Sequence, residues 1–258
     1  MPERFHLLSK NSRSSSVNVF ITHQTILDLA ACLFLLISLV IKPLGTNDSA
    51  ALFVCWFFQS FAVSVTAGQA SVCGLMVITV ERYVKIVHPV AYRNHYRPWM
   101  TRVGIVVPWI FGIGTGLVPT WATSYVARGR CYRSQWPNRT QQLVWNVWRF
   151  ILLYVGPLVV FVFGYWRILA VVRRQRKQVG QSQPQAASRT AAEKSSKQTE
   201  MNVIRAMVLV SVSFAVCFVG IRVYTVLTSL KAVPAIGSLY VLFSVFAYGN
   251  RCLNPTNS

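Results

Sequence analysis

The chain has 258 residues and a net charge of +20, and 53% of its residues are hydrophobic while only 12% are charged. This composition is too apolar for an ordinary soluble domain, and six apolar runs approach or exceed the roughly 20 residues that a helix needs to cross a bilayer. Their lengths differ from the roughly 10-residue alternation of barrel strands. The sequence therefore predicts an all-α, polytopic helical membrane bundle with six transmembrane helices at about 17–41, 51–84, 100–122, 144–172, 202–230 and 235–258.

The basic residues gather in alternate loops, which argues against nucleic-acid binding. They precede the first run, separate the second from the third, and cluster around the link between the fourth and the fifth. The positive-inside rule places these segments, and both ends of the chain, in the cytoplasm. The opposite link at 123–143 carries Arg128, Arg130, Arg133 and Arg139, which weakens the asymmetry without reversing it.

Asp28 lies well inside the first apolar run. A carboxylate at that depth is costly unless it faces a polar interior. Position alone leaves two interpretations open, a structural hydrogen-bond anchor or part of a cation or proton site.

The second run ends in Glu81-Arg82-Tyr83, where an apolar helix leaves the membrane. An arginine at such a place either reaches the headgroups or needs a polar partner. In the third run, Gly112 and Gly116 form a small-xxx-small pattern that lets another helix approach closely. We expect packing within the chain rather than dimerisation.

Pro157 lies in the middle of the fourth run and is expected to kink it, and Tyr165 comes near its inner end. Residues 177–199 are rich in Gln, Ser, Ala and Lys and have no apolar periodicity, which predicts a disordered cytoplasmic loop. Glu200 follows in the first turn of the next helix, where an acid favours the helix dipole.

The outer loops carry two acceptor patterns for N-glycosylation, at Asn47 and at Asn138. Cys55 and Cys131 also lie on the outer side, where the redox context permits a disulfide. No Cys/His spacing indicates a metal site, and no nucleophile–base set indicates an enzyme.

In order and spacing, these residues resemble a rhodopsin-like (class A) G-protein-coupled receptor that lacks its first transmembrane helix and its cytoplasmic tail. The resemblance covers the chain from about residue 17 to the end, and it implies that residues 1–258 form a single receptor domain that is incomplete. The residues that match helices two to seven of the family are, in order, Asn18 and Asp28; Cys55 and Glu81-Arg82-Tyr83; Trp109 and Pro119; Pro157 and Tyr165; Phe214, Cys217 and Phe218; and Asn250 with Asn254-Pro255.

The resemblance implies roles for the matching positions. Arg82 would pair with Glu81 at rest and face a heterotrimeric G protein when freed, and Glu200 would offer a second resting partner. A disulfide would join Cys55 to Cys131, and no cofactor is expected apart from a possible allosteric Na⁺. The implied switch residues are Glu81, Arg82, Tyr83, Tyr165, Glu200, Asn254 and Pro255, and the implied sodium site is Asp28, Ser71, Asn250 and Asn254.

The chain also departs from the family pattern. Gly220 replaces the usual proline of the sixth helix, and Ser258 stands where the last motif has tyrosine, which removes the expected active-state partner of Tyr165. Arg251 lies beside the implied sodium site, where a second cation would compete for Asp28.

The ligand pocket implied by the resemblance combines one cation with aromatic and hydroxyl side chains. Such a set suits a ligand that carries a carboxylate or another anion. The sequence around Arg82 resembles neuropeptide receptors, so a peptide is the favoured ligand, with lipids or other acidic small molecules left open. The implied pocket residues are Phe61, Ser64, Phe218, Arg222, Tyr240, Ser244 and Tyr248.

The expected function is therefore that of a multi-pass plasma-membrane receptor, a glycoprotein that passes an extracellular peptide signal to a heterotrimeric G protein by helix rearrangement around Arg82. Two alternatives remain. A non-signalling truncated receptor could associate with full-length receptors, or Asp28, Arg222 and Arg251 could line the path of an ion channel or transporter.

Overall fold

A computed structural model describes the backbone of residues 2–41, 45–46, 48–181, 191–230, 232–234, 239 and 242. Within these ranges, five segments are long and apolar enough to cross a membrane: Val19–Val40, Ser49–Val87, Pro98–Ala122, Arg139–Arg174 and Ser211–Ser229. They confirm the first five predicted spans. The sixth predicted span, 235–258, lies outside the described residues apart from 239 and 242.

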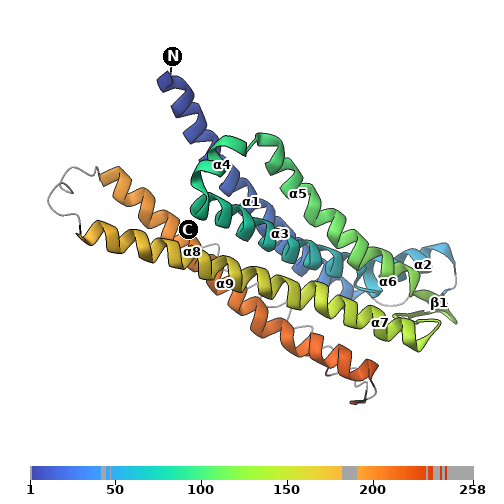
Figure 1. The fold of residues 1–258 in the computed structure, drawn as a ribbon. Helices are drawn as coiled ribbons and strands as arrows, with labels where there is room; N and C mark the ends of the chain where they lie inside the picture. The colour runs from blue at the N-terminus through green and yellow to red at the C-terminus, as the bar shows by residue number, and fades with distance from the viewer. Residues whose placement is uncertain are drawn as a thin grey trace.

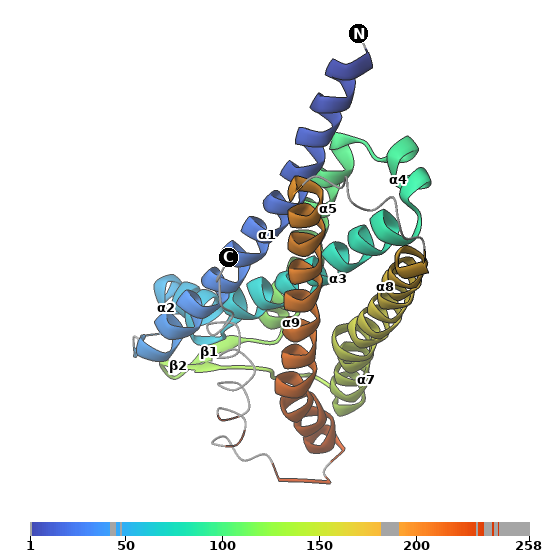
Figure 2. The same cartoon turned by 90° about the vertical axis from the view of Figure 1, so that its left-hand side faces the viewer.

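Helix α3 (Ala62–Val87) is the axis of the bundle. It packs against α1 (Pro2–Val40), α5 (Pro98–Gly112) and α8 (Gly156–Gln181), which surround it in Figures 1 and 2. Helix α9 (Ala191–Ser229) packs against α8 and against α7 (Arg139–Phe150), and the short helix α4 (Pro89–His95) connects α3 to α5. A helix buried on several sides needs small residues, and α3 supplies Ala62, Ala67, Ala70 and Gly74 along its length.

The glycines of the third span let α5 approach α3. A Cβ at Gly112 would lie 2.6 Å from the Thr66 carbonyl oxygen, and one at Gly116 would lie 3.0 Å from the Thr66 Cα. Gly114, between them, faces open space, because a Cβ added there would meet nothing within 4 Å. The small-xxx-small face therefore packs within the chain.

Two π-helical segments precede prolines. Segment η2 (Ile113–Leu117) comes before Pro119 at the start of α6 (Val118–Ala122), and η3 (Ile151–Val155) comes before Pro157 in α8. Proline lacks the N–H that would bond four residues back, and its ring clashes with the carbonyl there, so the preceding turn widens. The irregularity expected at Pro157 thus takes the form of a π segment.

The predicted span 51–84 is interrupted near its outer end. It consists of α2 (Ser49–Val54), a π segment η1 (Cys55–Gln59), a break at Ser60 and Phe61, and then α3. Phe61 has a φ of 59°, in the left-handed region, where a non-glycine side chain is strained. The Ser60 hydroxyl accepts from the Ala62 N–H and donates to the Trp56 carbonyl, so it competes with the helical hydrogen bonds.

One small sheet qualifies the all-α prediction. Strands β1 (Tyr125–Ala127) and β2 (Arg130–Tyr132) form an antiparallel hairpin, with Val126 opposite Cys131. Its two-residue turn, Arg128 and Gly129, has φ values of 50° and 68°, the doubly left-handed geometry that suits tight hairpins. The first turn position holds an arginine instead of the usual Asn, Asp or Gly, so the sequence carries no clear signal of this hairpin.

The loop predicted to be disordered at 177–199 overlaps both flanking helices. Helix α8 continues to Gln181 and α9 begins at Ala191, while residues 182–190 lie outside the described part of the chain. Disorder of this loop stays a prediction.

Candidate functional site

The inner end of α3 carries a compact polar cluster. Glu81 and Arg82 are both buried, with Arg82 Nε 3.6 Å from Glu81 Oε2. The other carboxylate oxygen, Oε1, accepts a hydrogen bond of 2.8 Å from the Tyr92 hydroxyl of α4. One carboxylate therefore holds both the arginine and the helix that follows α3.

The ion pair is long and incompletely satisfied. Neither Arg82 Nε nor Glu81 Oε2 has a hydrogen-bond partner among the described residues, although both atoms are buried. Buried charged groups in proteins normally have such partners, because an unsatisfied one retains its desolvation penalty. The Glu81–Arg82 contact therefore leaves a buried polar atom of each side chain without a hydrogen bond among the described residues.

Tyr92 was not anticipated from the sequence. Burial and the neighbouring Glu81 carboxylate raise the pKa of its phenol above the ordinary value, so it stays protonated and remains a hydrogen-bond donor. Its ring stacks on Tyr96, with the centroids 4.5 Å apart. A tyrosine eleven residues after Glu81, in a basic loop, gives no sequence signal of this contact.

Tyr83 and Tyr165, the two expected switch tyrosines, make different contacts. The Tyr83 ring packs against His88 and Phe163. The Tyr165 hydroxyl lies 3.2 Å from the hydroxyls of both Thr79 and Ser211, and it thus joins α8 to α3 and α9. The Glu200 side chain, Asn254 and Pro255 lie outside the described residues.

Asp28 sits in a second polar cluster, between α1 and α3. Its Oδ1 accepts from the Ser71 hydroxyl at 2.6 Å, and its Oδ2 accepts from Gln24 Nε2 at 3.3 Å. Gln24 Nε2 also lies 2.6 Å from the Ser71 oxygen. The structure thus brings Asp28 and Ser71 together and adds Gln24, one turn before Asp28, which the sequence pattern did not single out. Asn250 and Asn254 lie outside the described residues.

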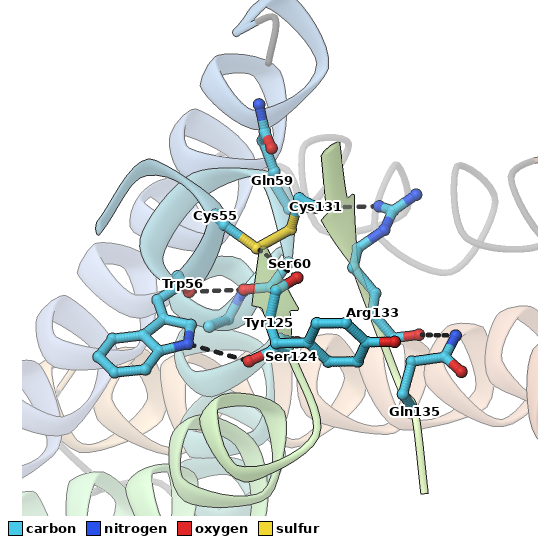
Figure 3. Close-up of a disulfide and its surroundings, with 10 residues drawn as sticks. Cys55, Trp56, Gln59, Ser60, Ser124, Tyr125, Cys131, Arg133 and Gln135 are labelled. Atoms are coloured by element: carbon cyan, nitrogen blue, oxygen red, sulfur yellow. Dashed lines mark hydrogen bonds between the residues drawn. A yellow bond between two sulfur atoms is a disulfide. The ribbon is translucent and has the colours of Figure 1, made fainter. Parts of the chain in front are cut away.

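At the outer end, a disulfide joins Cys55 of η1 to Cys131 of β2, as the resemblance implied. The bond links residues 76 positions apart, and Figure 3 shows it running from Cys55 to Cys131. Trp56 Nε1 donates to the Ser124 carbonyl at 3.1 Å, and Arg133 donates to the Gln59 carbonyl at 3.0 Å, on either side of the disulfide (Figure 3).

Beside the disulfide lies a cavity of about 570 Å³ between α3, α6, α7, α9 and the loop after the hairpin. Phe61, Phe218 and Arg222 line it, as the sequence suggested. Ser64 does not, because it is fully buried and donates its hydroxyl to the Ala31 carbonyl at 2.8 Å. Tyr240, Ser244 and Tyr248 lie outside the described residues.

The two expected glycosylation positions differ in what the structure describes. Asn138 is exposed and immediately precedes α7, while Asn47 lies outside the described residues.

The ring of Phe218 connects this cavity to the inner half of the bundle. Phe218 packs on Phe214 with centroids 4.7 Å apart, Phe214 meets Phe161 at 6.0 Å, and Phe161 meets Tyr165 at 6.3 Å. These rings belong to the buried core between α3, α8 and α9. A change at the cavity floor therefore has a continuous packed route to the Tyr165 hydroxyl.

Comparison with known proteins agrees with this geometry. Residues 5–256 match the family model of the 7 transmembrane receptor (rhodopsin family). The chain is 26% identical to the adenosine receptor A2a of Cavia porcellus, over 82% of this chain and 54% of that protein. It is 26% identical to the somatostatin receptor type 5 of Rattus norvegicus, over 92% of this chain and 63% of that protein.

A third relative is the tachykinin-like peptides receptor 99D of Drosophila melanogaster, 27% identical over 72% of this chain and 37% of that protein. The chain thus spans less than two thirds of the length of these relatives. Because the family match covers nearly all of the chain, the protein belongs to the rhodopsin family of seven-transmembrane receptors and is a multi-pass plasma-membrane receptor rather than an enzyme.

Proposed function

We propose that this chain passes the signal of an extracellular peptide to a heterotrimeric G protein, by a helix rearrangement that frees Arg82. The observation that carries the proposal is the shared use of Glu81, whose carboxylate holds Arg82 at 3.6 Å and the Tyr92 hydroxyl at 2.8 Å. A buried guanidinium whose ion pair is long, and whose Nε has no hydrogen bond among the described residues, favours two-state behaviour, because an incoming protein surface can offer it a better partner.

A peptide is the ligand class that the relatives and the cavity favour together. Relatives at 27% and 23% identity are named as receptors for tachykinin-like peptides and for a QRFP-like peptide. The cavity combines aromatic walls with hydroxyl, amide and guanidinium groups, a mixture that suits a peptide end better than a purely apolar ligand.

The Asp28 cluster fits a sodium ion that would stabilise the resting state. Besides the Asp28 carboxylate and the Ser71 hydroxyl, Gln24 Oε1 is buried and has no hydrogen-bond partner among the described residues. Three oxygens of this kind suit a hard cation. We therefore propose Asp28, Ser71 and Gln24 as ligands on the described side of the site, and Asn250 and Asn254 as further ones.

The sodium proposal predicts that Gln24→Leu removes one oxygen and weakens the effect of Na⁺. The measurement is the thermal midpoint of the purified chain in NaCl and in choline chloride at equal ionic strength. We expect the Na⁺-dependent rise in the midpoint to be at least halved in Gln24→Leu, and to be lost in Asp28→Asn. An unchanged Na⁺ effect in both variants would exclude this cluster as the site.

The central test of the proposed function is nucleotide exchange on a panel of purified heterotrimeric G proteins, with the full chain in lipid nanodiscs. Arg82→Ala should reduce ligand-independent exchange at least about tenfold, which corresponds to the loss of about 1.4 kcal/mol. Arg102→Ala is the matched control, since Arg102 is an exposed arginine near the same membrane face. Equal exchange in Arg82→Ala and wild type would favour the non-signalling receptor, and an ionic current across bilayers would favour a channel.

Asn47 and Asn138 are proposed glycan acceptors, which a mobility shift after glycosidase treatment would test.

A further inference from the structure

We infer that the outer cavity recognises its peptide through a carboxylate, and that four arginines form the receiving site. This inference rests on the proposed peptide-receptor function and specifies the chemistry of the ligand. The cavity is lined by four guanidinium groups from three separate segments: Arg133 after the hairpin, Arg139 and Arg149 of α7, and Arg222 of α9. The sequence pattern alone had placed only Arg222 there.

The chain places no acidic residue among those that line this cavity. It has six acids in all, and none lies between Arg82 and Ala192 or after Glu200. The three acids whose side chains are described have partners elsewhere. Asp28 bonds Ser71 within the bundle, Asp48 bonds Thr46 and the Ala51 N–H at the start of α2, and Glu81 bonds Tyr92 at the inner end.

The two arginines with described hydrogen bonds are held by neutral groups. Arg133 donates to the Gln59 carbonyl at 3.0 Å, and its guanidinium lies 5.0 Å from the centre of the Phe61 ring. Arg139 donates to the Ser229 carbonyl at 3.1 Å, near the Asn146 amide, which donates to the Ser229 hydroxyl at 2.7 Å. Carbonyl oxygens fix the direction of these side chains but leave their full charge, so the site is oriented before a ligand arrives.

Arg149 and Arg222 place the remaining charge deeper. Both are half-buried, in helical segments long and apolar enough to cross the membrane. Cations at such positions mark functional paths more often than idle surface, because their desolvation must be offset. A carboxylate is the matching partner, since a guanidinium can bind both of its oxygens at once. Aromatic rings of Trp136, Trp145 and Phe218 in the same lining would contact the side chain next to it.

A peptide carries carboxylates at its C-terminus and on Asp or Glu, and the test separates these sources. The full chain in nanodiscs is incubated with four synthetic hexapeptide pools: with or without acidic residues, each with a free C-terminal carboxylate or a C-terminal amide. The thermal midpoint is the readout. We expect stabilisation by pools that carry a carboxylate and none from the amidated pool without acidic residues. The response of the amidated acidic pool and of the free-acid neutral pool tells which carboxylate is bound.

The arginines are then tested singly, against the most active pool. Arg222→Gln and Arg149→Gln should each weaken half-maximal stabilisation at least tenfold, while Arg102→Gln should leave it unchanged. Arg139→Gln provides a second measurement if a deeper variant does not fold, because Arg139 is exposed at the rim. Equal stabilisation by the neutral amidated pool, or stabilisation by no pool, overturns the inference. Because ligand-independent exchange does not use the peptide, its survival in that case leaves the proposed function standing.

Discussion

The inner and outer ends of this receptor treat charge in opposite ways. At the inner end, one carboxylate, Glu81, serves one arginine and one tyrosine of the same chain. At the outer end, four arginines line a cavity, and none of the residues in its lining is acidic. A charge met by a carboxylate of the same chain suits a switch between internal partners, while a cavity lined by arginines and by no acid suits recognition of an external anion.

The difference also appears in what holds each region. The outer end is fixed by a covalent link, the Cys55–Cys131 disulfide, and by hydrogen bonds to backbone carbonyls on either side of it. The inner end is held by side-chain contacts around Glu81. This difference suits the proposed function, in which the outer region presents a constant surface and the inner region rearranges through contacts that can be exchanged.

The largest expected effect comes from removing the outer clamp. In Cys55→Ser/Cys131→Ser, we expect a loss of about 3 kcal/mol, because the disulfide closes a long loop, and a loss of stabilisation by the carboxylate pools. The control is Cys217→Ser, whose thiol is free. Thermal unfolding and pool titration measure the two effects. If the double variant still binds the peptide pools, the hairpin held by the disulfide is not needed for the cavity.

The packing of α5 on α3 supports both regions and offers a matched pair of variants. Gly112→Ala places a Cβ 2.6 Å from the Thr66 carbonyl, so we expect a destabilisation of about 2 kcal/mol from overpacking. Gly114→Ala faces open space and should be neutral or slightly stabilising. The comparison of their thermal midpoints checks the helix interface, and equal midpoints would contradict it.

Tyr92→Phe sharpens the view of the inner end as a shared-partner switch. The variant removes the 2.8 Å hydrogen bond to Glu81 and keeps the ring that stacks on Tyr96. Removing this hydrogen bond should destabilise the resting state by about 1 kcal/mol relative to the active state, and ligand-independent exchange should therefore rise about fivefold. Tyr96→Phe is the control, since its ring stays in the stack while the contact of Tyr92 with Glu81 remains. A fall in exchange would mean that Tyr92 supports the active form instead.

The smallest expected effect concerns Asp48 at the start of α2. The Thr46 hydroxyl and then the Ala51 N–H lower the pKa of its carboxyl below the ordinary value of 3.8. A carboxyl whose pKa is lower in the folded than in the unfolded protein stabilises the fold at any pH above its unfolded pKa. This contribution is lost as the pH falls below about 4 and through the folded pKa. Asp48→Ala should therefore reduce the acid dependence of the thermal midpoint slightly, and an increased dependence would contradict the cap.

Much of the architecture could be predicted, because the thickness of the bilayer sets the length of each apolar segment and the positive-inside rule relates loop charge to sidedness. Five of the expected spans and the Cys55–Cys131 bond are confirmed. The break at Phe61 and the hairpin at Arg128-Gly129 escaped prediction, since Phe61 and Arg128 are left-handed residues other than glycine and leave no periodic signal. The π segments η2 and η3 had a usable signal, as each begins shortly before a proline.

The functional clusters were harder to predict than the spans. Asp28 and Ser71 could be paired through the resemblance, but Gln24 was hidden among the apolar residues of α1 although its amide bonds both. The arginines of the cavity come from positions up to 89 residues apart, Arg133 to Arg222, and the packing of α7 against α9 brings Arg139 and Arg149 beside Arg222. Such convergence depends on tertiary contacts and not on local pattern.

The most direct single measurement is ligand-independent nucleotide exchange by Glu81→Gln beside the wild-type chain, at equal amounts of folded protein. Glutamine keeps the shape of the side chain and can still accept from Tyr92, but it no longer attracts Arg82. If Glu81 restrains the switch, exchange should rise about five- to tenfold, which corresponds to roughly 1 to 1.4 kcal/mol. Exchange that stays at the wild-type level, or falls, would contradict the assignment of Glu81 as the resting partner of Arg82.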